Sequence, residues 1–210
     1  MSVTTCASKH TVKRSLVLSL AAVTGALLLA ACGGNDKGKD SDAAGGSAST
    51  PSAPASIQAA TFNDADVTFA QMMIPHHQQA LEMAKLAPGK ASSPTVKELA
   101  AKIEAAQDPE ITMMKSWLSA WGKPAPAGTD MGHGMPGTMS MDDMMKLQGA
   151  TGPEFDKMFL QMMIHHHNGA IEMAEDEQAK GTNPDAKSLA ERIASSQAAE
   201  VAQMTQLLNG

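Results

Sequence analysis

Two histidine pairs, His76-His77 and His166-His167, stand in nearly identical surroundings and could bind a metal ion through their imidazole nitrogens. The segment 69–84 reappears as 159–174, at an offset of 90 residues, with 11 of its 16 positions identical. The same offset holds without a gap as far as Leu118, which recurs as Leu208. The part of the chain that could do chemistry is therefore two copies of one unit.

The histidines fall on the apolar side of a predicted helix. With 3.6 residues per turn, His76 lies within the same stripe as Met73, and His77 lies at the flank of that stripe. In the second copy, an additional histidine, His165, takes the outward position that Pro75 occupies in the first. We therefore predict that both members of each histidine pair face the interior.

A second helix in each unit adds polar side chains to this interior. In an antiparallel hairpin that turns near residue 90, glutamine and glutamate side chains on its apolar stripe lie opposite the histidines, where they could orient the imidazoles. The candidate metal ligands are His76, His77, Met73 and Met83, with their copies His166, His167, Met163 and Met173. The candidate orienting residues are Glu110, Glu200, Gln107 and Gln197.

Burying such groups is costly unless they are hydrogen-bonded or coordinate a metal ion. One interpretation is a satisfied polar network, in which the imidazoles bond to glutamate and glutamine inside the core. The other is a site for a soft metal, because thioether sulfur favours Cu(I) and methionines lie on the same stripe. Both interpretations are compatible with the residues.

A methionine-rich segment lies between the two copies, where glycine and proline make a core pattern implausible. Its first part is a candidate for capturing Cu(I), through Met131, His133, Met135 and Met139. Its last part is expected to form a short helix near 141–148 that covers the end of the bundle with Met141, Met144 and Met145.

Each copy is predicted to be a helical hairpin. The first helices span about 64–87 and 153–180 and end at glycine-containing turns. The second helices begin at Ser93-Pro94 and Asn183-Pro184, each an N-cap residue followed by proline at the first helical position. Pro109, inside the second helix, is expected to kink it.

Two hairpins joined by a long connection make an all-α, ferritin-like four-helix bundle. The bundle is predicted to occupy residues 61–210, with repeat one at 61–121, the linker at 122–152 and repeat two at 153–210.

The first 31 residues are typical of a bacterial lipoprotein signal peptide. Lys13 and Arg14 precede an uncharged apolar run from Ser15, and the run ends in Leu29-Ala-Ala-Cys32. A retained transmembrane anchor is the alternative, although the run is at the short end for a span. We predict cleavage before Cys32, lipid attachment there, a flexible tether over 32–60, and an extracytoplasmic protein anchored to the cell membrane.

The amino-acid composition limits the kinds of partner that this protein is expected to bind. The 210 residues include 16 basic and 22 acidic side chains, and this acidic balance disfavours nucleic acid and favours cations. Both cysteines, Cys6 and Cys32, lie in or beside the predicted signal, so the bundle has no thiolate ligand. The expected partners are a metal ion and the membrane, through the lipid; a homo-oligomer is left open.

The repeated segments resemble a bacterial family known as domain of unknown function 305. Its hallmark is a Met-Ile-x-His-His-x-x-Ala-x-x-Met-Ala helix, which is matched here at 73–84 and 163–174. The resemblance spans about 62–210. It implies a ferritin-like four-helix bundle and extracytoplasmic copper binding or copper tolerance through His and Met.

Three functions compete at this point. The first is a lipid-anchored copper-binding protein without catalysis, and the second is a structural or protein-interaction bundle without metal. The third is a ferritin-like di-iron oxidase, which needs Glu-x-x-His motifs that are absent from this chain. No nucleophile triad or phosphate-binding glycine loop is visible.

Overall fold

The computed structural model describes residues 61–126 and 135–210. Its helices are α1 (Asp64–Ala84), α2 (Ala87–Lys90), α3 (Pro94–Ala120), α4 (Met141–Gly149), α5 (Gly152–Lys180) and α6 (Pro184–Asn209). The predicted signal peptide, Cys32 and the tether, as well as Met131 and His133, lie outside the described residues. None of the described helices has both the length and the apolar character needed to cross a membrane.

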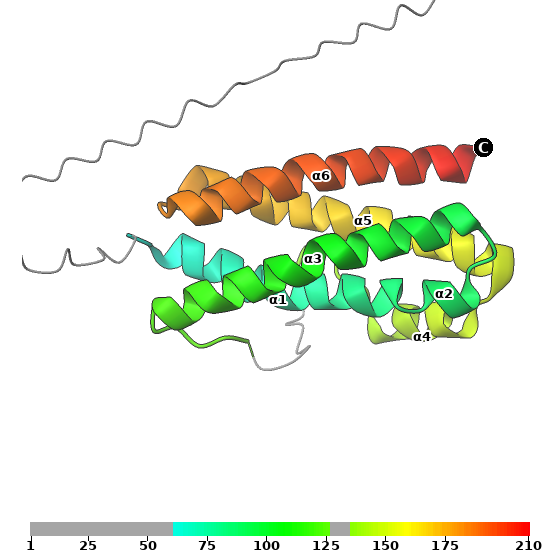
Figure 1. Cartoon of the computed structure of the whole chain (residues 1–210), viewed down its shortest axis with the longest axis horizontal. Helices are drawn as coiled ribbons and strands as arrows, with labels where there is room; N and C mark the ends of the chain where they lie inside the picture. Colours follow the sequence, from blue (N-terminus) through cyan, green and yellow to red (C-terminus); the bar gives the residue numbers. More distant parts are fainter. Residues whose placement is uncertain (1–60, 127–134) are drawn as a thin grey trace, which may run out of the picture. The chain divides into compact units, whose positions relative to one another are not determined.

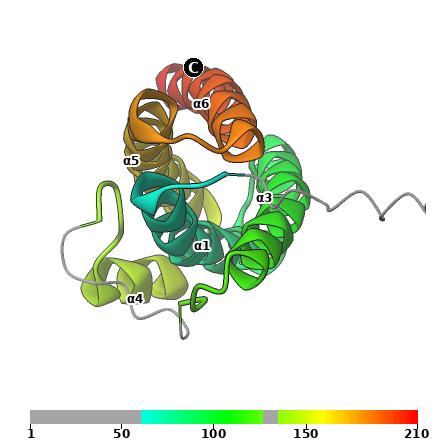
Figure 2. The ribbon, with the colours of Figure 1, turned by 90° about the vertical axis from the view of Figure 1, so that its left-hand side faces the viewer.

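Four long helices form the bundle, as predicted. Helix α1 packs against α3 and α5 packs against α6, so each repeat is an antiparallel hairpin, and the hairpins meet where α1 contacts α5. Seen end-on in Figure 2, α1, α3, α5 and α6 surround a common interior, and α4 lies outside, beside α1. The all-α fold class is confirmed.

The helix boundaries follow the predicted caps. Ser93 and Asn183 accept hydrogen bonds from the first turns of α3 and α6, and a proline follows each of them at the first helical position. Helix α3 continues through Pro109 to Ala120. A short helix, α2, occupies the turn in which only a chain reversal was expected.

Two aspartates related by the repeat join the hairpins at opposite ends. Asp66 of α1 accepts hydrogen bonds from the backbone nitrogens of Thr182 and Asn183, at 3.1 and 2.9 Å, where α6 begins. Asp156 of α5 does the same for Ser92 and Ser93, at 3.1 and 2.9 Å, where α3 begins. Each hairpin therefore caps the second helix of the other, which requires α1 and α5 to run antiparallel.

The core consists of two apolar clusters whose methionines are related by the offset of 90 residues. One cluster contains Met73, Met114 and Met173, and the other contains their equivalents Met163, Met204 and Met83. These six thioethers, which the repeat relates in pairs, are each no more than 7% exposed. Because each cluster draws on both repeats, neither hairpin completes the core alone.

Helix α4 packs against the second half of α1 and the first half of α5. Met144 and Leu147 are buried there, in the apolar cluster that contains Met83, Met163 and Met204. The expectation that Met141 and Met145 also cover the bundle was wrong, since they are 79% and 55% exposed. Only one side of this short amphipathic helix meets the bundle, and these two residues lie on the other side.

Candidate metal centre

Four buried imidazoles form a layer across the middle of the bundle. His76 and His77 of α1 and His166 and His167 of α5 are each 0% exposed. The rings of His76 and His166 face each other, with 3.7 Å between their centroids and 35° between their planes. The antiparallel packing of α1 on α5 thus brings the two histidine pairs, 90 residues apart in sequence, into one site.

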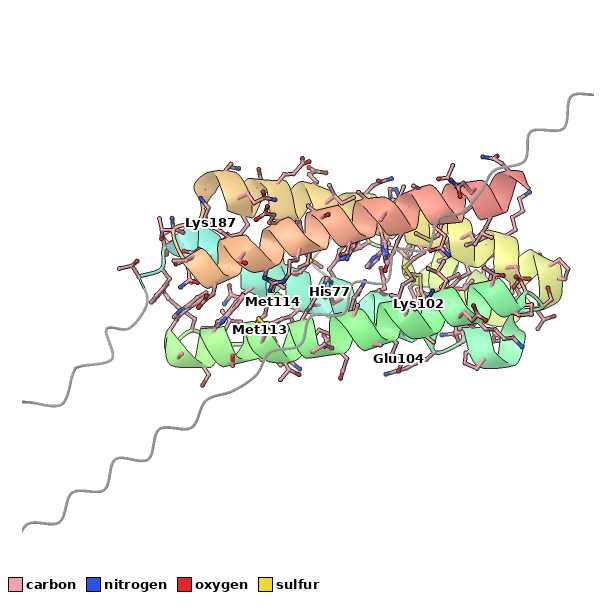
Figure 3. All side chains as sticks on the ribbon, turned by 45° about the horizontal axis from the view of Figure 1, so that its top comes forward. His77, Lys102, Glu104, Met113, Met114 and Lys187 are labelled. Carbon is pink, nitrogen blue, oxygen red and sulfur yellow. The ribbon has the colours of Figure 1, made fainter. Side chains whose placement is uncertain are left out.

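Two of these imidazoles are held by glutamates of the second helices. His77 Nε2 donates to Glu110 at 2.8 Å, and His167 Nε2 donates to Glu200 at 2.6 Å. Figure 3 shows His77 and Met114 between the helices, whereas Glu104 projects outward from α3. Because a carboxylate only accepts, each bond uses the Nε2 proton and leaves Nδ1 on the side of the ring away from the glutamate.

The other two imidazoles donate to backbone carbonyls, and here the repeat symmetry is broken. His166 Nε2 donates to the carbonyl of His76 at 3.0 Å. His76 Nε2 donates instead to the carbonyl of Pro136, at 3.1 Å, within the methionine-rich segment. That segment therefore contacts the histidine layer directly.

All four Nδ1 atoms are buried and have no hydrogen-bond partner. Burial, together with the neighbouring imidazoles, lowers the pKa of His76 to about 3 and holds the pKa of His166 well below its usual value. The rings of His76 and His166 are therefore neutral at pH 7, and each presents an unprotonated nitrogen. An unpaired buried acceptor destabilises the fold unless it is used, and a metal ion is one group that could use it.

Thioether sulfurs lie on the same helices. Met73 and Met163 are one helical turn before His77 and His167, and both are fully buried. Met83 is fully buried, and Met173 is 7% exposed.

Sequence reasoning did not select Met114 and Met204 as ligand candidates, although they share these clusters. Their spacing four residues after Glu110 and Glu200 was the available signal, because it places them on the same helix face.

The two glutamines make no contact of the expected kind. Gln107 and Gln197 are buried, at 2% and 3% exposure, but neither is hydrogen-bonded to a histidine. Both amide atoms of Gln107 and the amide oxygen of Gln197 have no partner. His165, by contrast, is exposed as expected, so only two of the three consecutive histidines enter the site.

The segment 135–140 packs against α1 and α5 beside the histidines. The Gln79 amide exchanges two hydrogen bonds with the backbone of Met139, at 2.8 and 3.0 Å. Gly169 lies against Pro136 so closely that a Cβ added there would be 2.2 Å from the Pro136 carbonyl oxygen. Met135 and Met139 are half-buried in this segment, and Met139 packs against the core.

The same segment explains one wrong expectation. Pro75 was placed on the outer side of its helix, but it is buried. Gln79, one turn later on that side of α1, is also buried and bonded to Met139. The outer side of α1 is therefore covered by a segment that helix periodicity does not describe.

Asp66 and Glu177 form a pair of buried acids near the start of α1 and the end of α5. Glu177 is 2% exposed, and burial together with the neighbouring Asp66 carboxylate raises the pKa of Glu177 to about 8. The pKa of Asp66 is lowered: burial acts to raise it, but the Glu177 hydrogen bond and the backbone N–H groups of Asn63, Asn183 and Thr182 outweigh that effect. At neutral pH Glu177 therefore retains a proton that Asp66 can accept.

The family assignment follows from a match over most of the bundle. The profile of the family described as "Domain of unknown function (DUF305)" matches residues 66–208. The chain belongs to the DUF305 family. Among curated proteins, none matches it.

Solved structures of similar proteins share this fold. A DUF305 protein from Streptomyces coelicolor is 35% identical with a TM-score of 0.64, over 69% of this chain and 92% of that one. A DUF305 fragment from Deinococcus radiodurans is 30% identical with a TM-score of 0.64, over 71% and 97%. CopM in its Cu(II)-bound form is 39% identical with a TM-score of 0.61, over 69% and 95%. CopM has also been solved with Cu(I) and with Ag.

Proposed function

We propose that this DUF305 protein is a non-catalytic copper-binding protein that holds Cu(I) inside the bundle. The observation that supports this most is the set of four buried imidazoles whose Nδ1 atoms have no partner. A purely structural polar network would satisfy those atoms. Copper-bound forms of CopM, a similar protein, support the same class of ligand.

The proposed ligands combine imidazole nitrogen with thioether sulfur. Within residues 61–126 and 135–210, no group of three or more His, Cys, Asp or Glu side chains is placed to hold a metal ion. Soft thioethers complete a Cu(I) site in the absence of thiolates. The proposed set is His76, His77, Met73 and Met83, with His166, His167, Met163 and Met173.

Glu110 and Glu200 are proposed to orient these ligands rather than to bind copper. Each accepts the Nε2 proton of one histidine, so the opposite nitrogen, Nδ1, is the one available to the metal. Met131, His133, Met135 and Met139 are proposed to capture ions from solution, and the segment that contains the last two contacts His76 through Pro136.

A Cu(I) competition titration against a chromophoric chelator tests this proposal. The protein is the whole chain with Cys6 and Cys32 replaced by serine, so that no thiolate competes. The variant His76→Ala/His166→Ala should lose tight binding, and the matched control His165→Ala, which removes an exposed histidine, should retain it. Equal affinity in all three proteins would contradict a site inside the bundle.

A second comparison separates the bundle from the methionine-rich segment. Deleting Met131–His133 should slow or weaken capture while leaving the tight site intact. Loss of all binding in that deletion would assign copper to the segment and leave the bundle as its scaffold. Absence of copper binding in every version would instead favour a structural or protein-interaction bundle.

We further propose an extracytoplasmic location, with the chain cleaved before Cys32 and anchored by lipid on that residue. The Leu29-Ala-Ala-Cys32 sequence and the apolar run before it support this proposal. Metabolic labelling with a fatty acid should mark the protein and place it in the membrane fraction, and Cys32→Ser should abolish both. Labelling that persists in Cys32→Ser would contradict the proposal.

A further inference from the structure

A proline-glycine turn carries the carbonyl group to which His76 donates. The turn is closed at its ends, where the Met135 carbonyl accepts hydrogen bonds from the backbone nitrogen and the hydroxyl group of Thr138, at 3.4 and 3.0 Å. Pro136 in the second position and Gly137 in the third, with a φ of 74°, are typical of a type II turn. The acceptor of His76 therefore belongs to a turn of defined geometry.

The repeat shows what this turn replaces. The ring of His166 donates to the main-chain carbonyl of His76, so the symmetric acceptor for the ring of His76 would be the carbonyl of His166. Gly137 lies against that carbonyl instead, since a Cβ on Gly137 would be 2.9 Å from the His166 oxygen. The ring of His76 donates to the adjacent residue, Pro136. The turn thus supplies a substitute acceptor for Nε2 and leaves Nδ1 on the opposite side of the ring.

Two positions related by the offset of 90 residues hold this turn from different helices. On α1, Gln79 is 2% exposed, and its amide exchanges two hydrogen bonds with the backbone of Met139, at 2.8 and 3.0 Å. On α5, the equivalent residue is Gly169, and a Cβ there would be 2.2 Å from the Pro136 oxygen and 2.7 Å from the Gly137 Cα. One copy of this position therefore binds the segment 135–140, and the other makes room for it.

We propose that Gln79 is a positioning residue of the metal centre, which acts through the segment 135–140 and the Pro136 carbonyl on the ring of His76. With this carbonyl in place the ring keeps one orientation, and Nδ1 is the nitrogen that it presents to the metal ion. Gly169 serves the same end, because it lets the turn approach α5. The inference rests on the proposed function, since the orientation of His76 matters to copper only if His76 binds it.

A Cu(I) competition titration on the whole chain carrying Cys6→Ser and Cys32→Ser tests this role. Gln79→Ala should weaken Cu(I) binding by about tenfold or more, which is the loss typical of removing an indirect partner of a metal ligand. Gln71→Ala is the matched control, because Gln71 also lies in α1 and donates to a backbone carbonyl outside it, that of Pro124, at 2.8 Å. The control should bind Cu(I) as the parent does.

A second variant displaces the same segment from the other helix. Gly169→Ala should weaken Cu(I) binding in the same way as Gln79→Ala, so the test does not depend on the folding of one variant. Its matched control is Gly149→Ala, because a Cβ at Gly149 meets no atom within 4 Å. Similar losses from substitutions on two helices would point to the segment that both positions contact.

The ring-nitrogen NMR spectrum of the metal-free protein gives a readout that a general loss of stability would not move. In the parent, His76 should show a protonated Nε2 and an unprotonated Nδ1. In Gln79→Ala and in Gly169→Ala, the Nε2–H signal of His76 should shift or exchange with water. The Nε2–H signal of His166 should stay, because its acceptor lies in α1 and not in the segment.

The two proposals fail in different ways. Cu(I) affinity that is unchanged in both Gln79→Ala and Gly169→Ala overturns the positioning role, and so does an unchanged Nε2–H signal of His76. A parent protein that binds no Cu(I), or whose binding survives His76→Ala/His166→Ala, overturns the proposed function, and the role of Gln79 at a metal centre falls with it. The spectra of the metal-free protein do not depend on copper, so they still show whether Gln79 orients His76.

Discussion

The substitution Gly169→Ala should destabilise the protein, although helix propensity alone predicts the opposite. Gly169 lies inside α5, where alanine is intrinsically favoured over glycine by about 1 kcal/mol. The atoms nearest to the added methyl group would be backbone atoms, at 2.2 Å for the Pro136 oxygen and 2.7 Å for the Gly137 Cα. Backbone cannot rotate away, so the segment 135–140 must retreat by about 1 Å to restore normal contact distances.

The cost follows from the hydrogen bonds that this segment makes. A shift of about 1 Å breaks the 3.1 Å bond from His76 to Pro136 and leaves a buried N–H group unpaired, which costs about 1–3 kcal/mol. The two bonds between Gln79 and Met139 are disturbed as well, each worth about 0.5–1.5 kcal/mol. After the gain in propensity, a net loss of about 1–5 kcal/mol remains.

Urea unfolding followed by circular dichroism measures this loss, and amide hydrogen exchange locates it. The Met139 amide, which donates to Gln79, should be protected in the parent protein and exchange faster in the variant. Gly149→Ala is the matched control, because a Cβ there meets no atom within 4 Å. If Gly169→Ala unfolds at the same or higher urea concentration and Met139 protection is unchanged, the docking of this segment has been misjudged.

Three further predictions concern the buried polar groups. Asp66→Ala should lower the free energy of unfolding by about 2–3 kcal/mol, since backbone N–H groups at the start of α6 lose their acceptor; a change below the error of urea unfolding would contradict this. Gln107→Leu should leave the melting temperature unchanged or higher, because neither amide atom has a partner to lose; a clear decrease in calorimetry would indicate a contact that the structure lacks. Lowering the pH from 7.5 to 5 should reduce stability through His76 and His166, because the unfolded rings take up protons below pH 6.5 and the folded rings do not. The urea midpoints should be measured in the Glu177→Gln variant, because Glu177, with its pKa raised to about 8, changes the stability with pH in the opposite direction. Equal midpoints at pH 7.5 and pH 5 would refute the lowered pKa values of His76 and His166.

The sequence by itself determined the repeat, the four long helices and the caps of the second helices. It also identified the inward direction of the histidine pairs. These features depend on local signals: an N-cap residue followed by proline, and an apolar stripe with helical period. The glutamates opposite the histidines could be anticipated, because the turn near residue 90 fixes the register of an antiparallel hairpin, and Glu110 indeed bonds to His77.

Tertiary structure alone decided how the two copies differ. Helix periodicity treats His76 and His166 alike, but only His76 donates to Pro136, a residue 60 positions away. The burial of Pro75 and the fit of Gly169 against Pro136 depend on the same segment, whose course no local pattern predicts. Packing alone placed Asp66 at the start of α6, more than 100 residues along the chain. Such contacts join positions that are distant in sequence, so their partners are set by how the hairpins pack and not by local sequence.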